Sequence, residues 1–269
     1  MPVSEQPQEN PRTLPAVRFE GVTLRRSGQT ILDRVDWSVG RGEHWALLGP
    51  NGAGKTTALR IASAQLRPSS GSAWVLGGRL GSVSMPALRR RVGVVEPALG
   101  RRFYPVQTAR DVVASGFAGT ILPEDDVDLA RADELLADVG AAALASRPFA
   151  TCSEGERARI LLARALATEA EMLVLDEPAA GLDLPGRELL LRAFDRAVDA
   201  RGELTTLSAT HHVEELSPRT THALLMRGGA VVAAGPLRES LTDATLTACF
   251  GLPLAVEEAN GRYFVRARA

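Results

Sequence analysis

The chain has 269 residues, of which 45% are hydrophobic, and this length and apolar content suffice for one large domain with a buried core. Its 31 Lys and Arg residues nearly balance its 32 Asp and Glu residues, which leaves a formal net charge of −1. We therefore do not expect the main task of this protein to be covering nucleic acid or an acidic membrane surface, because both tasks need an excess of cations. Thirty of the 31 cationic residues are arginines, and the single lysine is Lys55.

Cysteine usage and the first residues of the chain narrow the class further. Cys152 and Cys249 lie far apart, and neither belongs to a C-x-x-C or Cys/His cluster, so we expect no disulfide framework and no structural zinc. This usage indicates a reducing compartment. The sequence has no apolar run that resembles a signal peptide or a membrane span, and residues 1–15, rich in proline and polar side chains, are predicted to be a disordered leader.

Short apolar runs predict a strand-rich beginning and a sheet that continues later in the chain. The early runs are residues 17–24, 30–39 and 44–49. The third run leads into a glycine-rich turn and then into a helix-periodic stretch over residues 58–66. Four later runs are also predicted as strands, at residues 92–95, 172–176, 205–210 and 222–226. Because they are apolar throughout and alternate with helical segments, they predict a parallel α/β sheet.

A helical lobe is predicted to interrupt this sheet. Between about residues 97 and 170 the strand patterns stop, and three stretches show 3.6-residue periodicity instead. After Arg227 a Gly-Gly turn leads to a strand-rich tail. The predicted parts of the single domain, residues 16–269, are the α/β core (16–96 and 171–240), the helical lobe (about 97–170) and the tail (241–269).

A glycine-rich loop before the first predicted helix matches the pattern G-x-x-x-x-G-K-[ST]. Glycines let the backbone fold around a polyphosphate, and the helix N-terminus adds partial positive charge. Lys55 is expected to reach the β- and γ-phosphates as a compact point charge, a position that the longer planar fork of arginine would not fill in the same way. The predicted ATP-binding residues of this loop are Gly49, Pro50, Asn51, Gly52, Ala53, Gly54, Lys55, Thr56 and Thr57.

An acidic pair at the end of the predicted strand 172–176 completes the expected catalytic set. We expect the Thr56 hydroxyl and the Asp176 carboxylate to hold Mg²⁺, and Thr57 to bond an α-phosphate oxygen. Glu177 is the candidate general base that polarises the attacking water. An apolar run ending in Asp-Glu is by itself common, so this assignment depends on the phosphate loop that precedes it.

Several motifs in a fixed order make the sequence resemble the ATP-binding-cassette (ABC) ATPases over nearly the whole predicted domain. They are the phosphate loop, the segment 152–156, the acidic strand, residues 180–183 and Thr210-His211 after the next strand. The resemblance implies a P-loop NTPase core with a mainly parallel sheet, an N-terminal antiparallel β subdomain and an inserted helical lobe. It also implies that two such domains face each other head to tail across two ATP molecules.

The resemblance assigns further roles to individual residues. Ser153 and Gly155 match the signature residues that contact the γ-phosphate held by the partner domain, within a signature segment that also contains Glu154 and Glu156. His211 matches the switch histidine that senses the γ-phosphate and joins Lys55 and Glu177 in the catalytic set. Asp183 matches the loop that communicates across the dimer.

Three positions depart from the family pattern. In the signature, usually Leu-Ser-Gly-Gly-Gln, the residues Cys152, Glu154 and Glu156 stand at three of the five positions. The aromatic residue that usually stacks on adenine aligns near Arg26, whose guanidinium can also stack on a base. The glutamine that usually ends the strand 92–95 falls at Glu96 or Pro97, and the nearest glutamine, Gln107, lies too far along the chain.

These features predict an ATP-hydrolysing subunit, a homodimer or pseudo-symmetric heterodimer, that drives a separate membrane permease from the cytoplasmic side of the cell membrane. The tail is similar to the ends of cassette subunits that serve metal-chelate or other small-solute importers, which favours transport. Two alternatives remain: a soluble cassette protein with a regulatory or repair-type role, and a nucleotide-binding module without hydrolysis, which Glu177 and His211 disfavour. The transported solute does not follow from this chain, because in the family the permease or a binding protein recognises it.

Overall fold

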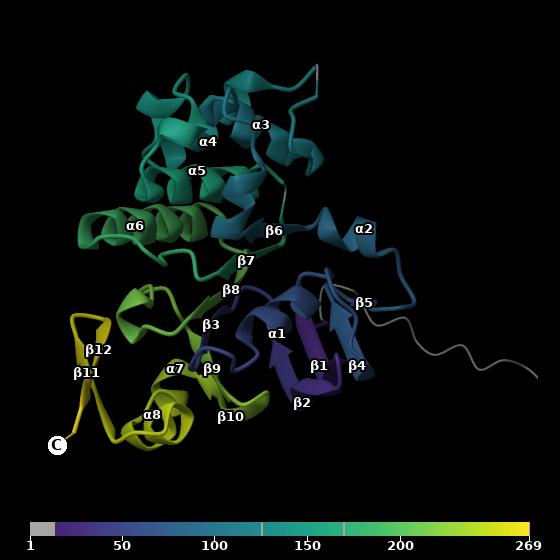
Figure 1. Cartoon of the computed structure of the whole chain (residues 1–269), viewed down its shortest axis with the longest axis vertical. Helices are drawn as coiled ribbons and strands as arrows, with labels where there is room; N and C mark the ends of the chain where they lie inside the picture. The colour runs from purple at the N-terminus through teal and green to yellow at the C-terminus, as the bar shows by residue number, and fades with distance from the viewer. Residues whose placement is uncertain (1–13, 125, 169, 269) are drawn as a thin grey trace, which may run out of the picture.

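The computed structural model describes residues 14–124, 126–168 and 170–268. The predicted leader lies largely outside these described residues. The chain forms an α/β core in the middle of the view in Figure 1, with a helical lobe above it and the C-terminal elements below it.

A four-stranded antiparallel sheet forms the first part of the core. Its order is β2-β1-β4-β5. The strands are β1 (Val17–Arg26), β2 (Gln29–Val39), β4 (Ser70–Val75) and β5 (Gly78–Arg79). Strands β4 and β5 were not predicted from the sequence, because they are short and contain Gly and Ser rather than alternating apolar residues.

A six-stranded sheet forms the second part, and its order is β10-β9-β3-β8-β7-β6. Five neighbouring strands run parallel, and β10 joins the edge antiparallel to β9. The strands are β3 (His44–Leu48), β6 (Val92–Val95), β7 (Met172–Asp176), β8 (Thr205–Thr210), β9 (His222–Arg227) and β10 (Ala230–Pro236). The predicted parallel sheet is therefore confirmed, and β3, β7 and β8 place their carboxyl ends along one edge.

The helix α1 (Lys55–Ala62) lies between the two sheets. Its residues Ala58, Leu59 and Ile61 are fully or almost fully buried, in a core shared with side chains of both sheets. This packing holds the start of α1 close to the carboxyl ends of β3 and β7.

Helices and 3₁₀ turns follow β6 and precede β7. The main helices are α3 (Ala109–Ala118), α4 (Leu129–Asp138) and α5 (Glu154–Ala167). They pack into a second core together with α6 (Leu184–Ala200), which follows β7. The 3₁₀ helix η1 (Pro97–Arg102) begins directly after the edge strand β6, so the lobe starts beside the sheet.

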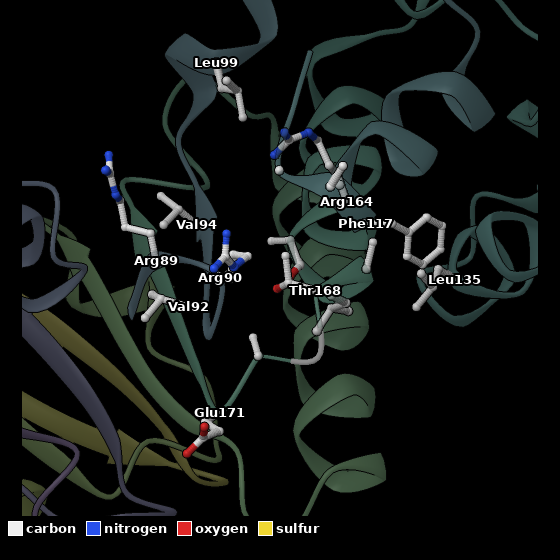
Figure 2. A pocket seen from close by; sticks show the side chains of 18 of the residues that line it. Arg89, Arg90, Val92, Val94, Leu99, Phe117, Leu135, Arg164, Thr168 and Glu171 are labelled. Atoms are coloured by element: carbon white, nitrogen blue, oxygen red, sulfur yellow. The ribbon is translucent and has the colours of Figure 1, made fainter. Parts of the chain in front are cut away.

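A groove of about 1510 Å³ lies between β6 and the lobe. Figure 2 shows Val92 and Val94 of β6 on one side and Phe117, Leu135 and Arg164 on the other. Six arginines line it: Arg89, Arg90, Arg102, Arg131, Arg164 and Arg201. The short helix α2 (Met85–Arg89) brings the first of them to the wall of the groove.

The C-terminal part contains more helix than the sequence analysis predicted. It comprises α7 (Leu237–Ser240), α8 (Asp243–Phe250) and a separate hairpin of β11 (Leu254–Ala259) and β12 (Arg262–Ala267). The expected strand-rich tail is thus correct for the hairpin and incomplete for α7 and α8, because their short apolar segments lack a long helical period. Over the described residues, no helix has the length and apolarity to cross a membrane.

Candidate nucleotide-binding site

The loop between β3 and α1 has a backbone that requires glycine at two positions. Gly49 has φ +152°, and a Cβ there would lie 2.2 Å from the Met226 carbonyl oxygen. Gly54 has φ +101°, and a Cβ there would lie 2.7 Å from a methyl carbon of Leu32. Gly54 also caps α1 without a side-chain hydrogen bond, so no side chain occupies the first N–H groups of the helix. These groups are free to receive phosphate oxygens.

Lys55 is buried inside this loop. Its side chain is 5% exposed, and Nζ donates hydrogen bonds to the carbonyl oxygens of Gly49 at 2.7 Å and Pro50 at 3.2 Å. Burial lowers the pKa of Lys55, and the nearby carboxylates of Glu177 and Asp176 partly oppose this shift. The ammonium group is thus enclosed by backbone carbonyls in a space suited to a compact cation.

Thr56 and Asp176 form the second part of the site. The Thr56 hydroxyl donates a hydrogen bond of 3.0 Å to Asp176 Oδ1 at the end of β7. Burial raises the pKa of Asp176, while the hydrogen bond from Thr56 opposes this shift. A hydroxyl and a carboxylate oxygen are hard donors of the kind that hold Mg²⁺ together with substrate phosphates and water, so these residues fit that ion.

Glu177 has an unusual backbone conformation. Its φ is +49°, and its N–H donates to the Ala209 carbonyl of β8 at 3.0 Å. Non-glycine residues in this region carry strain and are frequent at functional sites. The conformation turns the side chain toward Lys55 and His211, with Glu177 Oε1 lying 3.9 Å from Lys55 Nζ and 3.3 Å from His211 Nδ1.

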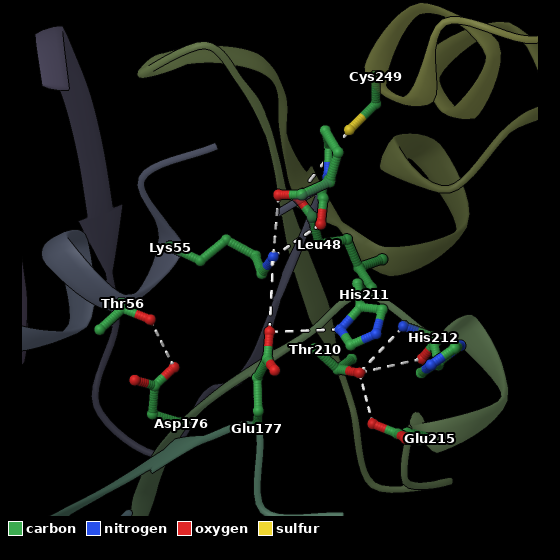
Figure 3. A network of polar contacts seen from close by, with 12 residues as sticks. Leu48, Lys55, Thr56, Asp176, Glu177, Thr210, His211, His212, Glu215 and Cys249 are labelled. Carbon is green, nitrogen blue, oxygen red and sulfur yellow. Dashed lines mark hydrogen bonds and ion pairs between the residues drawn. The ribbon is translucent and has the colours of Figure 1, made fainter. Parts of the chain in front are cut away.

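A polar network supports His211 at the end of β8 (Figure 3). Thr210 Oγ1 donates a hydrogen bond of 2.5 Å to Glu215 Oε2 and accepts one of 3.0 Å from the His212 N–H. The rings of His211 and His212 have centroids 4.1 Å apart. Glu215 and His212 therefore hold the loop that carries His211 from its far side, which is a structural role for His212.

A pocket of about 450 Å³ collects nine of the predicted residues, whereas Gly49, Pro50 and His211 are not among the described residues that line it. Its lining includes the loop residues 51–57 together with Asp176 and Glu177. Glu96 and Pro97 line the same pocket, and the charge of Glu96 contributes to the raised pKa of Asp176. Gln107 has a different environment in the lobe, where it is buried and hydrogen-bonded to Tyr104 and Ile121.

The lining of this pocket differs from the sequence-based prediction at three residues. Arg26 is absent from the described residues that line this pocket, whereas Ile31 of β2 is present. Arg60, which the sequence analysis missed, also lines it and lies near enough to Asp176 to lower its pKa. Because Arg60 lies four residues after Thr56 on α1, the helical period would have indicated that it shares the same face.

The signature segment lies at the start of α5, outside the pocket lining. Glu156 Oε2 accepts a hydrogen bond of 2.8 Å from the Ser153 N–H, and the Glu156 N–H donates to Ser153 Oγ at 3.3 Å. This capping box turns the Glu156 carboxylate back onto its own helix, where Arg147 also contacts it at 3.3 Å. Glu154 pairs with Arg157 at 2.9 Å. Both carboxylates thus have partners within their own chain.

Gly155, at the start of α5, lies against Gly186 in the first turn of α6, the helix that Asp183 caps. Asp183 caps α6, and its Oδ1 accepts a hydrogen bond of 2.8 Å from the Gly186 N–H. A Cβ on Gly155 would lie 3.2 Å from the Gly186 Cα. The signature helix and the helix after Asp183 are therefore packed together with little space between their backbones.

Comparison with known proteins identifies the family to which this chain belongs. The family model described as "ABC transporter" matches residues 32–180, which is more than half of the chain. An uncharacterised ABC transporter ATP-binding protein, YlmA of Bacillus subtilis, is 39% identical over 244 residues, covering 89% of this chain and 92% of the relative. The chain belongs to the ABC transporter ATP-binding family. It is an ATP-binding and ATP-hydrolysing subunit of an ABC transporter.

Two further relatives agree with this family. The hemin import ATP-binding protein HmuV of Nocardia farcinica is 38% identical over 251 residues, covering 89% of this chain and 84% of the relative. The structure of cbiO1 from Clostridium perfringens, part of the ABC transporter complex cbiONQ, has a TM-score of 0.73 and 26% identity, covering 87% of this chain and 93% of that chain. These relatives carry transporter names, and they do not support a soluble regulatory or repair-type role for the cassette.

Proposed function

We propose that this ABC cassette, a single domain from residue 16 onward, dimerises head to tail on two Mg²⁺-bound ATP molecules and drives a membrane permease from the inner face of the cell membrane. The observation that carries the proposal is the convergence of Lys55, Asp176 and Glu177 in one pocket, with His211 bonded to Glu177. The partner is a second copy of the chain or a related cassette. The transporter names of relatives such as HmuV and cbiO1 support the proposal of a permease partner.

The residues of the pocket divide the work of ATP hydrolysis. The open N–H groups at the start of α1 bind phosphate oxygens, and Lys55 adds a buried positive charge beside them. Thr56 and Asp176 would hold Mg²⁺, which supplies positive charge to the transferred phosphoryl group. Glu177 accepts a proton from the attacking water, and His211 orients the Glu177 carboxylate.

The partner cassette completes the site through its signature helix. Ser153 and Gly155 lie at the start of α5, where N–H groups and the helix dipole favour an anion. Asp183 caps α6, which packs on α5, so a change at either helix start reaches the other. We propose Arg26 as a contact for adenine, although Ile31 and not Arg26 is among the described residues that line the pocket.

The groove beside β6 is the proposed docking site for the permease. Arg164 has hydrogen bonds to the Ser115 hydroxyl and the Thr120 carbonyl, and burial together with the nearby Arg102 lowers its pKa. A cationic wall of this kind favours an acidic segment of the permease. Glu96 lines both this groove and the nucleotide pocket, so it provides a physical connection between the two.

The test of hydrolysis is the substitution Glu177→Gln. It keeps the shape of the side chain and removes the base, so kcat should fall by about 100-fold or more while ATP binding persists. ATP-bound dimers should accumulate, measured by light scattering after size exclusion. Glu239→Gln, on an exposed position of α7, serves as the control. Unchanged turnover in Glu177→Gln would contradict the proposed base.

The test of docking is the double substitution Arg89→Glu and Arg90→Glu. Reversal of two charges in the groove should release the cassette from the membrane fraction of its native cells while the ATPase activity of the purified cassette is retained. Arg34 and Arg238, with side chains 81% and 80% exposed outside the groove, provide the control double substitution to Glu. Equal membrane retention of both double variants would contradict the docking assignment.

A further inference from the structure

The C-terminal hairpin holds one arginine against two other elements of the core. Asn260 and Gly261 form its two-residue turn, with φ of +53° and +73°, and Arg262 begins β12 directly after them. This turn type suits Asn-Gly and fixes the register of the two strands. Arg262 therefore starts from a rigid position.

The guanidinium of Arg262 bridges α6 and the 3₁₀ helix η4 (Val213–Glu215). It donates two hydrogen bonds to the Glu188 carboxylate of α6, at 2.9 and 3.1 Å, and a third of 3.0 Å to the Glu214 carbonyl oxygen. These hydrogen bonds lower the pKa of Glu188. The backbone N–H of Val265 adds a contact of 3.3 Å to the Glu214 carboxylate. A bidentate arginine–carboxylate pair is a strong and directional contact.

Both bridged elements follow directly on residues of the proposed site. The helix η4 begins two residues after His211, and Glu215 in η4 accepts the hydrogen bond from Thr210, which precedes His211. The helix α6 begins after its cap Asp183. The hairpin thus joins the segment that carries the switch histidine to the helix behind the dimer-facing loop. Figure 1 shows the hairpin at the side of the core, next to these elements.

The position of His211 needs such support. Its contact with Glu177 is 3.3 Å long, and both side chains are one-third exposed. The helix η4 is three residues long and has no side-chain cap of its own. A three-residue turn has few hydrogen bonds of its own, so its contacts with other elements, the burial of Val213 and the bonds from Arg262 and Val265, decide where it lies.

We propose that Arg262 is a positioning residue for catalysis: by clamping η4 to α6 it keeps His211 aligned with Glu177. The inference rests on the proposed roles of His211 and Glu177. We expect the clamp to affect hydrolysis and not ATP binding. The phosphate loop and α1 lie between the two sheets, and contacts other than the clamp hold their phosphate-binding groups in place. Loss of the clamp lowers kcat and leaves the ATP affinity as it is.

The experiment compares Arg262→Ala with Arg266→Ala in the full chain. Arg266 lies on the same strand and pairs with Glu257 of the hairpin at 2.7 Å, so its removal tests the hairpin without the bridge. For Arg262→Ala we expect kcat to fall about five-fold, with KM for ATP changed by less than about two-fold. Hydrogen exchange should quicken in residues 211–216. Arg266→Ala should behave like the wild type in both measurements.

Two additional variants keep the test decisive. Glu188→Gln removes the charge of the partner with little change of shape and should reproduce the lower kcat and the faster exchange in residues 211–216. Arg262→Lys keeps a cation without the bidentate geometry and should recover only part of the activity. If Arg262→Ala fails to fold, the comparison of Glu188→Gln with Arg266→Ala decides whether the bridge between Arg262 and Glu188 supports kcat.

The outcomes also separate this inference from the proposed function. If His211→Ala abolishes turnover while Arg262→Ala and Glu188→Gln match Arg266→Ala in kcat and exchange, the clamp is wrong and the catalytic assignment stands. If His211→Ala leaves turnover unchanged, the proposed role of His211 fails first. Faster exchange in residues 211–216 with unchanged kcat would also overturn the positioning role, because the loop would then be loosened without effect on hydrolysis.

Discussion

The starts of α1 and α5 are two helix N-termini that the proposed mechanism uses for the same anion, and they are built in opposite ways. At α1 the cap is Gly54, without a side chain, so the first N–H groups are left for a ligand. At α5 the cap is Ser153, and a reciprocal capping box with Glu156 already occupies two of the N–H groups. The first terminus has no side-chain cap, whereas the second carries a carboxylate of its own helix at the cap.

The two termini also belong to different packing units. The helix α1 lies in the core shared by the two sheets, whereas α5 packs with α3 and α6 in the core of the lobe. A phosphate can therefore bind at α1 without rearrangement, and the open cap fits a role in tight binding. At α5, a phosphate of the partner would approach a terminus that already holds the Glu156 carboxylate, so this terminus fits a role in closure.

Blocking the α5 terminus should have the largest effect. Ser153 is exposed, so Ser153→Arg places a large side chain at the surface and leaves the core intact. We expect hydrolysis to fall by at least about 100-fold while the monomer still binds ATP, because the trans contact is lost. Ser153→Ala removes the cap without the bulk and is the control for cap loss. Normal activity of Ser153→Arg would show that α5 is not a trans site.

Changing the shape of the cation at α1 should have the next largest effect. Lys55→Arg preserves charge but puts a longer planar group into a space bounded by the carbonyls of Gly49 and Pro50. We expect ATP affinity, measured by calorimetry, to weaken about ten-fold. Arg67→Lys, the reverse exchange at an exposed position outside the pocket lining, is the control. Equal affinity of Lys55→Arg and wild type would remove the steric argument for lysine.

Removing the negative charge of the α5 cap should have the smallest effect of the three. Glu156→Gln keeps an oxygen that accepts the Ser153 N–H bond and removes a negative charge near the place where a phosphate would bind. We expect ATP-driven dimerisation, measured by analytical ultracentrifugation with turnover blocked, to strengthen about two- to five-fold, in line with a helix-terminus charge effect. Glu154→Gln, which changes a carboxylate paired with Arg157, is the control. Weaker dimers in Glu156→Gln would mean that the carboxylate assists closure.

Local sequence signals were sufficient for much of this molecule. The runs at residues 92–95, 172–176 and 205–210 became β6, β7 and β8, because strands buried on both faces need continuous apolar sequence. The phosphate loop was recognisable because its glycines are required by local backbone geometry. The S-x-x-E pattern at Ser153 is likewise typical of the capping box that the structure contains.

Other features depend on contacts between distant parts of the chain. The short strands β4 and β5 are held by pairing with β1 and with each other, and their own sequence is weakly strand-like. The Asn260-Gly261 turn was a local signal for the hairpin, but its docking through Arg262 onto Glu188 was not, since 74 residues separate them. The facing of Glu96 toward the nucleotide pocket likewise follows from the sheet order.

The sequence by itself determined the family, the phosphate loop with its single lysine, and the order of the catalytic motifs. These depend on residue type and spacing within short segments, where backbone sterics and periodicity act directly. Only the tertiary structure decided that Arg147 contacts the Glu156 carboxylate of the signature segment and that Arg262 ties the histidine loop to α6. Both depend on where side chains from separate elements meet, which is set by the packing of the whole chain.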